Sequence, residues 1–217
     1  MALFIDQLDI WLMTLGITLI TSAYGVYMTF IRRPKVATDG ASETVQVTRA
    51  VYVEVSRVLG IFYTAVGVYA LATGVWASIT WPLPSSYNLM FSDAWPMFGF
   101  VSLMIGLALA LGYDVRYLSI PLMLFGIPVI VYGADILTYH LTREPTLAAG
   151  MYILLGLALL LNPGVMLTRG NVSRYMGYLV MMLLVLSGIL AFVIGIPATF
   201  EHTAGWLKWA PWYGVSG

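Results

Sequence analysis

Residues 174–197, RYMGYLVMMLLVLSGILAFVIGIP, contain no charged side chain after Arg174. This run exceeds the roughly 20 apolar residues that an α-helix needs to cross the hydrocarbon core of a bilayer. The stretch therefore predicts a transmembrane helix, and it makes the bilayer the first environment to consider for the rest of the chain.

The composition of the whole chain agrees with this prediction. Of its 217 residues, 60% are hydrophobic and 9% are charged, whereas a soluble domain has about 25% charged residues. Too few polar groups are present to cover a globular surface, so we expect lipid to be the solvent. The formal net charge is zero, which gives no electrostatic basis for binding nucleic acid. The absence of cysteine excludes disulfides, thiolate metal ligands and cysteine nucleophiles.

Five further apolar stretches are candidate spans. The first has no basic segment before it, so we expect a permanent span there rather than a cleaved signal peptide. The sequence thus predicts a single all-α domain over residues 1–217, a polytopic helical bundle of about six transmembrane helices in the cell (plasma) membrane. The six candidate spans are Leu8–Ile31, Arg57–Ile79, Pro96–Tyr113, Tyr117–Tyr139, Thr146–Leu161 and Arg174–Pro197.

The uneven distribution of basic residues predicts the orientation of the bundle. Arg143 and Lys208 are the only Lys or Arg residues on one side of the predicted membrane. Because positive charge is retained on the cytoplasmic side, both termini are predicted to lie outside. The other eight basic residues follow the first, third and fifth spans: Arg32, Arg33, Lys35, Arg49, Arg57, Arg116, Arg169 and Arg174.

The outer connection over residues 80–96 contains the sequence WPLPSSYNLMFSD. Pro82 and Pro84 favour an extended path, and the side chains of Asn88 and Asp93 can accept hydrogen bonds from turn amides. We therefore expect an ordered cap over the outer side of the bundle rather than a slack connection.

Two other segments flank the spans. Residues 198–217 are too short and too polar to cross the bilayer, and their aromatic residues favour a short interfacial helix. Residues 37–57 are ambiguous, because valines at alternate positions suit a strand. An isolated strand has no partner there, so we favour a helix that leads into the second span.

Glycine recurs every seven residues in four of the predicted spans. Seven residues are about two helical turns, so each row lies on one face, and small residues let helix backbones approach closely in lipid. The rows therefore predict helix-packing faces, within one bundle or between copies of the chain, with a glycine-lined passage as the alternative. The rows are Gly60, Gly67 and Gly74; Gly99 and Gly106; Gly126 and Gly133; and Gly188 and Gly195.

Three of the predicted spans also resemble one another, through MTLGITLI in the first, LMIGLALALG in the third and ILLGLALLLNPG in the fifth. Three tandem helical hairpins would explain this similarity. A shared bias toward leucine, alanine and glycine would explain it equally well.

Polar side chains gather on the predicted outer side, whereas the middle of every span lacks charge. Asp135 is the only acid well inside an apolar stretch, about one turn from the outer end of the fourth span. A proton pump needs titratable groups across the bilayer, so this class is disfavoured. The candidate outer-face polar site consists of Tyr87, Asn88, Asp93, Asp135, Tyr139, His140, Arg143, Glu144, Glu201 and His202.

The two histidines raise the question of a metal or haem. Histidines with carboxylates can bind zinc, copper or iron, and two histidines can ligate a haem. The spacing of His140 and His202 matches no known motif, and neither lies deep in a span. We therefore expect no metal or other cofactor and keep the two histidines as low-ranking candidate ligands.

The motifs WPLPSSYNLMFSD, GADI at Gly133–Ile136 and TREP at Thr142–Pro145 resemble an uncharacterised archaeal family of multi-pass membrane proteins, a domain of unknown function. The resemblance covers about residues 8–165. It implies an all-helical membrane protein from an archaeal source, and it implies no activity and no catalytic residue.

Three function classes remain open. The favoured one is a non-catalytic accessory or assembly subunit of a larger membrane complex, because the spans lack deep polar groups and carry glycine rows. The second is a channel or carrier for a small, weakly charged solute, and the third is a metal- or haem-binding membrane protein. An enzyme is disfavoured. The expected partners are the lipid bilayer and other membrane protein chains or a second copy of this chain.

Overall fold

The structure is a computed structural model that describes residues 7–32 and 43–205. Within these ranges the fold is all helical, as predicted, with no strand. The α-helices are α1 (Gln7–Val26), α2 (Glu43–Thr80), α3 (Ala94–Ala110), α4 (Ser119–Tyr139), α5 (Pro145–Leu160), α6 (Asn162–Met166) and α7 (Gly170–Gly205). Three short helical turns precede or follow them: the π-helical η1 (Tyr27–Ile31) and η2 (Asn88–Ser92) and the 3-10 turn η3 (Val115–Leu118).

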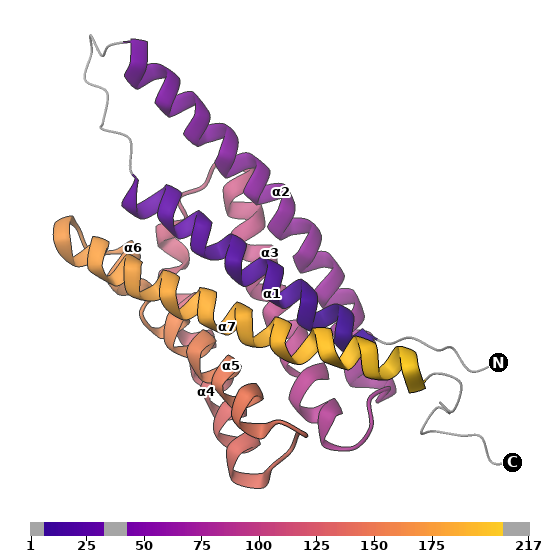
Figure 1. Cartoon of the computed structure of the whole chain (residues 1–217). Coiled ribbons are helices and arrows are strands. Elements are labelled where there is room, and N and C mark those ends of the chain that lie inside the picture. The colour runs from indigo at the N-terminus through magenta and orange to yellow at the C-terminus, as the bar shows by residue number, and fades with distance from the viewer. Residues whose placement is uncertain (1–6, 33–42, 206–217) are drawn as a thin grey trace, which may run out of the picture.

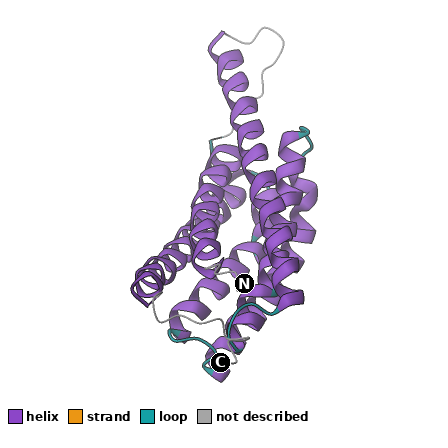
Figure 2. Cartoon of the chain, turned by 90° about the vertical axis from the view of Figure 1, so that its right-hand side faces the viewer, coloured by secondary structure: helices purple, strands orange, loops and turns teal. Residues whose placement is uncertain are grey.

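The long helices pack as three pairs: α1 with α7, α2 with α3, and α4 with α5 (Figure 1). Helix α5 also packs against α7 and so joins two of the pairs, whereas α1 touches α2 and α3 touches α4 only slightly. Figure 2 shows the same helices from the side. Tandem hairpins would pair the first span with the second, the third with the fourth and the fifth with the last; of these, only the fifth and the last, α5 and α7, pack extensively.

Five helical stretches of the described chain are long and apolar enough to cross a membrane. They are Gln7–Ile31, Ala50–Thr80, Asn88–Ala110, Val115–Tyr139 and Gly170–Gly205. The predicted fifth span is the shorter α5, whose 16 residues rise about 24 Å. A typical hydrocarbon core is about 30 Å thick. The structure therefore has five long candidate spans and one short apolar helix, rather than six comparable spans.

The structure gives the bounds of three segments that flank the predicted spans. The second helix already begins at Glu43, so helix was the correct choice for the described part of residues 37–57. The expected outer loop is mostly helical, because helical turns begin at residue 86, run through η2 and lead into α3, which leaves only residues 81–85 as a connection. Helix α7 continues through Pro197 to Gly205, and a separate interfacial helix over residues 198–205 is therefore wrong. The rest of the predicted tail lies outside the described residues.

The glycine rows lie where paired helices meet. A Cβ atom added to Gly67 of α2 would lie 2.5 Å from the backbone nitrogen of Leu103 in α3. One added to Gly106 of α3 would lie 2.4 Å from the nitrogen of Thr64 in α2. These two helices thus pack backbone against backbone. The other glycines of the rows also face a partner helix of the same chain: Gly60, Gly74, Gly99, Gly126, Gly133, Gly188 and Gly195.

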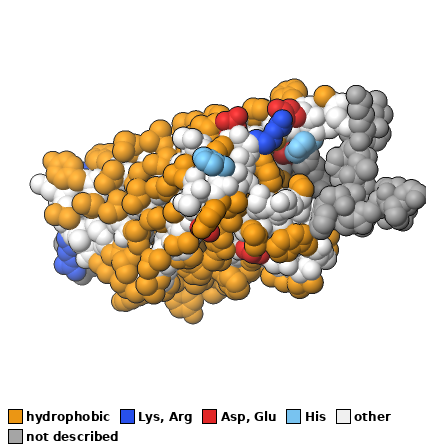
Figure 3. Space-filling model, turned by 90° about the horizontal axis from the view of Figure 1, so that it is seen from below, with side chains coloured by type: hydrophobic (Ala, Val, Ile, Leu, Met, Phe, Trp, Pro, Cys, Tyr) orange, Lys and Arg blue, Asp and Glu red, His pale blue; other side chains and the backbone are white. Residues whose placement is uncertain are grey.

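The outer surface of the bundle is largely apolar. Large side chains such as Ile61, Ile79 and Leu111 have about two-thirds or more of their surface exposed. Figure 3 shows hydrophobic side chains over most of one face, with basic side chains at its left end and acidic ones from its middle to its right side. This distribution is compatible with insertion in a membrane.

Candidate functional site

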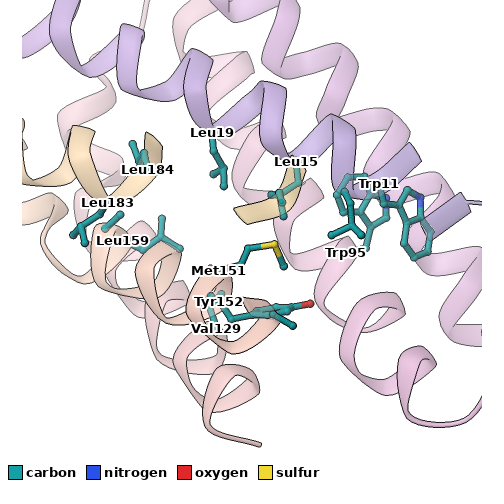
Figure 4. Packing of buried hydrophobic residues seen from close by; sticks show 14 of the residues in the cluster. Trp11, Leu15, Leu19, Trp95, Val129, Met151, Tyr152, Leu159, Leu183 and Leu184 are labelled. Carbon is teal, nitrogen blue, oxygen red and sulfur yellow. The ribbon is translucent and has the colours of Figure 1, made fainter. Parts of the chain in front are cut away.

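A cavity of about 170 Å3 lies between the three helix pairs. Every long helix contributes to its wall, and the lining residues extend along α1 from Trp11 to Val26 and on to Phe30 in η1. Figure 4 shows several of these side chains, including Leu15, Leu19 and Met151, pointing into the space between the helices. The wall is almost wholly apolar, and no described charged side chain lines it.

Aromatic rings line the cavity near the starts of α1 and α3. The rings of Trp11 and Trp95 stack with centroids 5.3 Å apart, and Trp95 stacks on Phe98 at 4.8 Å. Phe91 of η2 lies against Tyr152 of α5, with centroids 6.2 Å apart. The cluster therefore brings together α1, α3 and α5, one helix from each pair.

Hydroxyl groups line another part of the wall, where α1 faces α2. The Tyr63 hydroxyl donates a hydrogen bond to Ser22 Oγ at 2.9 Å. Ser22 in turn donates to the carbonyl oxygen of Thr18 at 2.8 Å, and Thr18 Oγ1 donates to the carbonyl oxygen of Thr14 at 2.7 Å. These residues were not among those predicted from the sequence. Their signal was the four-residue spacing of Thr14, Thr18 and Ser22 on one helix face.

Some of the predicted outer-face residues join the cap to the connection between α4 and α5. The N–H of Arg143 donates to the Tyr87 hydroxyl at 2.9 Å, and Ser86 Oγ donates to the carbonyl oxygen of Leu141 at 2.7 Å. The Tyr152 hydroxyl also donates to the carbonyl oxygen of Met90. The α2–α3 pair is therefore fastened to the α4–α5 pair at this end of the bundle.

Asn88 is fully buried beneath the cap. Its Oδ1 accepts hydrogen bonds from the backbone nitrogen of Leu83 and from Ser92 Oγ, both at 3.1 Å. Its Nδ2 has no hydrogen-bond partner among the described residues. The side-chain oxygen replaces a backbone acceptor and lets the chain turn directly into η2, which explains why the expected loop is short.

Two polar contacts extend the connection to α7 and α1. Arg143 pairs with Glu201 of α7, and both side chains are exposed. His202 Nδ1 lies 3.0 Å from Asp9 Oδ2, and Asp9 is buried in the first turn of α1. Asp9 was not among the predicted residues, although an acid at a helix N-terminus is favourably placed relative to the helix dipole.

The remaining predicted residues differ in exposure. Asp93 and Asp135 are half-buried, within electrostatic range of the Tyr132 hydroxyl, whereas Tyr139, His140 and Glu144 are exposed. His140 has φ 50° and ψ 50°, the left-handed conformation that commonly ends a helix, at the C-terminus of α4.

The structure gives no metal cluster in the described ranges, 7–32 and 43–205. No three or more His, Cys, Asp or Glu side chains there come together as metal ligands do. Figure 3 also shows the histidine side chains separated on the surface. A shared site built on His140 and His202 therefore has no support from these residues.

Comparison with known proteins places the chain in a family without assigning an activity. No curated protein and no solved structure matches the chain. The sequence does match a protein family over residues 1–205, which extends beyond the residues 8–165 that the motifs had suggested. The chain belongs to the family described as "Protein of unknown function (DUF981)".

Proposed function

We propose that this chain is an integral membrane protein that binds a small, uncharged and mostly apolar molecule between its helix pairs. The observation that carries the proposal is the cavity of about 170 Å3 with an apolar, aromatic wall. Small-molecule sites combine such walls with a few polar groups. An apolar cavity of about 150 Å3 in an engineered protein binds benzene, so the space suits a molecule of similar size.

The chemistry of the wall favours binding over conduction. A channel for a polar solute needs polar groups that replace the hydration of that solute along its path, and this wall is nearly all apolar. A small apolar molecule crosses a bilayer unaided, so a protein that holds one is more useful as a binding protein than as a passage. The carrier hypothesis is therefore restricted to solutes without formal charge.

The sparse contacts between pairs support entry from the bilayer. Helices α3 and α4 touch only slightly, yet both contribute to the wall, through residues such as Val101, Ile105, Leu122 and Phe125. A molecule dissolved in the hydrocarbon core can enter there by a small separation of the two pairs, without passing through the cap.

Uptake of 4-fluorotoluene by the protein in lipid nanodiscs tests this proposal. Fluorine NMR measures binding, and protein-free nanodiscs correct for partition into lipid. Ala158 is buried and lines the cavity, so Ala158→Leu should fill the space and abolish binding. Ala134 is exposed on α4, so Ala134→Leu is the matched control and should bind like the original chain. Absence of binding to the original chain would refute the proposal.

A second candidate function is the accessory or assembly subunit. It is favoured by α2, whose 38 residues extend well beyond the 17 residues of α3 (Figures 1 and 2). The projecting part carries exposed Val51 and Val53. Native mass spectrometry after gentle extraction tests this role, because a subunit retains companion chains and a self-sufficient binding protein does not.

We expect a multi-pass protein of the cell membrane with both termini outside, on the basis of the Lys and Arg distribution. The archaeal source rests on the motif resemblance alone.

A further inference from the structure

We infer that the molecule held in the cavity carries one hydrogen-bond donor, as a small phenol or alcohol does, and that this donor is received by the hydroxyl groups that α1 and α2 share. The inference rests on the proposed function, because it names the class of ligand for the same cavity. It follows from the arrangement of the wall and from the hydroxyl protons of the wall, which already take part in hydrogen bonds within the protein.

The wall separates aromatic from hydroxyl-bearing side chains along α1. Trp11 stacks on Trp95 at one end (Figure 4). Thr18 and Ser22 follow about two and three turns further along the helix. Both belong to the lining, as does Tyr63, which reaches Ser22 from α2. A ligand that matches this wall has an apolar body and one polar end.

The hydroxyl protons of Tyr63, Ser22 and Thr18 each already form a hydrogen bond within the protein. A hydroxyl group has one proton and two acceptor lone pairs. Tyr63 donates its proton to Ser22, Ser22 donates to the carbonyl oxygen of Thr18, and Thr18 donates to the carbonyl oxygen of Thr14. The three oxygens therefore retain lone pairs but offer no proton to a ligand.

This arrangement discriminates between ligands of the same size. An alcohol or phenol can donate to a free lone pair and gains a hydrogen bond inside an apolar wall. A nitrile or ketone would place its own lone pairs against those of Tyr63 or Thr18, and burial without a partner is costly. No described lysine or arginine lines the cavity, and further polar lining side chains, Thr29, Ser102 and Asn162, lie outside this group of bonded hydroxyls.

Ser102 provides an internal control. It is the buried hydroxyl that α3 contributes to the same wall, and it stands outside the chain of bonds from Tyr63 to Thr14. A ligand recognised by the α1–α2 hydroxyls should be indifferent to its removal.

Three fluorinated probes test the inference in nanodiscs, again with correction for partition into lipid. The original chain should bind 4-fluorophenol about 3- to 10-fold more tightly than 4-fluorotoluene, the value of about one net hydrogen bond. It should bind 4-fluorobenzonitrile, which only accepts, no better than 4-fluorotoluene. This comparison uses only the original chain, so its result does not depend on whether a variant folds.

Two variants then locate the recognition. Ser22→Ala releases the Tyr63 proton, so binding of 4-fluorobenzonitrile should tighten by about 3- to 10-fold, while Ser102→Ala should leave every preference unchanged. Equal binding of the three probes by the original chain overturns the inference and leaves the proposed function standing. A preference that disappears in Ser102→Ala and persists in Ser22→Ala also overturns it. Absence of binding by all three probes refutes the proposed function itself.

Discussion

Replacement of Gly67 by alanine should destabilise the pairing of α2 with α3. The new Cβ atom would lie 2.5 Å from the backbone nitrogen of Leu103 and 2.7 Å from its Cα, about 0.9 Å inside ordinary van der Waals contact with the nitrogen. A backbone atom cannot rotate away as a side-chain tip can, so the two helices must separate. Separation also weakens the contacts at Gly60 and Gly74, because a gap of 0.5–1 Å forfeits a quarter to a half of the dispersion energy.

The expected loss of stability follows from two opposed terms. Overpacking of this kind costs about 3 kcal/mol, the upper end of the usual range, and alanine regains about 1 kcal/mol over glycine inside a helix. The net loss of about 2 kcal/mol lowers the Tm by roughly 4–8 °C in a chain of this size.

The assay is thermal unfolding in detergent, followed by tryptophan fluorescence, with Gly150→Ala as the matched control. A Cβ atom at Gly150 meets only the flexible Cδ1 of Leu190, at 3.3 Å, so this variant should be neutral or slightly stabilised. If Gly67→Ala melts at or above the temperature of Gly150→Ala, α2 and α3 do not pack backbone against backbone, and the argument for tight pairs fails.

Three further predictions concern the cap, the ionic contact and the orientation. Asn88→Ala should lower the Tm by at least about 5 °C. The buried Leu83 N–H and the Ser92 hydroxyl would each lose their acceptor, which costs about 1–3 kcal/mol for each group. An unchanged Tm would contradict the buried position of Asn88. Arg143→Gln should change the unfolding free energy by less than about 1 kcal/mol, because its pair with Glu201 is exposed, and a larger loss in denaturant unfolding would show that the contact is shielded from water. In this cysteine-free chain, a membrane-impermeant maleimide should label Tyr139→Cys in intact cells and Tyr113→Cys only after permeabilisation. Both positions are 69% exposed. The reverse labelling pattern would show that the predicted orientation in the membrane is wrong.

The long apolar runs made the existence and type of the helices predictable. A run such as residues 174–197 has only one stable conformation in lipid, because every backbone group must bond internally. The cap was harder to predict, because Pro82, Pro84 and the polar residues around them have the composition of a loop. The deciding feature is a tertiary one, the burial of the Asn88 side chain against the backbone nitrogen of Leu83.

The cavity could not be predicted from hydrophobic periodicity. In water, apolar residues mark the buried face of a helix, but lipid tails are as apolar as leucine and provide no such contrast. Leu107 is 43% exposed and Leu122 is 1% exposed, and nothing in their chemistry distinguishes them. The polar residues were also misleading, because the outer ones were conspicuous in the sequence, whereas Thr18 and Ser22 looked like ordinary helix residues.

The same feature that makes each pair tight explains why space is left between the pairs. Glycines bring paired backbones into contact, as at Gly67 and Gly106 between α2 and α3, and no comparable contact joins α3 to α4 or α1 to α2. A molecule in the cavity would therefore act on the distance between rigid pairs rather than on the pairs themselves. The polar contacts of the cap, including the bond from the Arg143 N–H to Tyr87, join neighbouring pairs at one end. Separation on binding should accordingly be smallest at the cap.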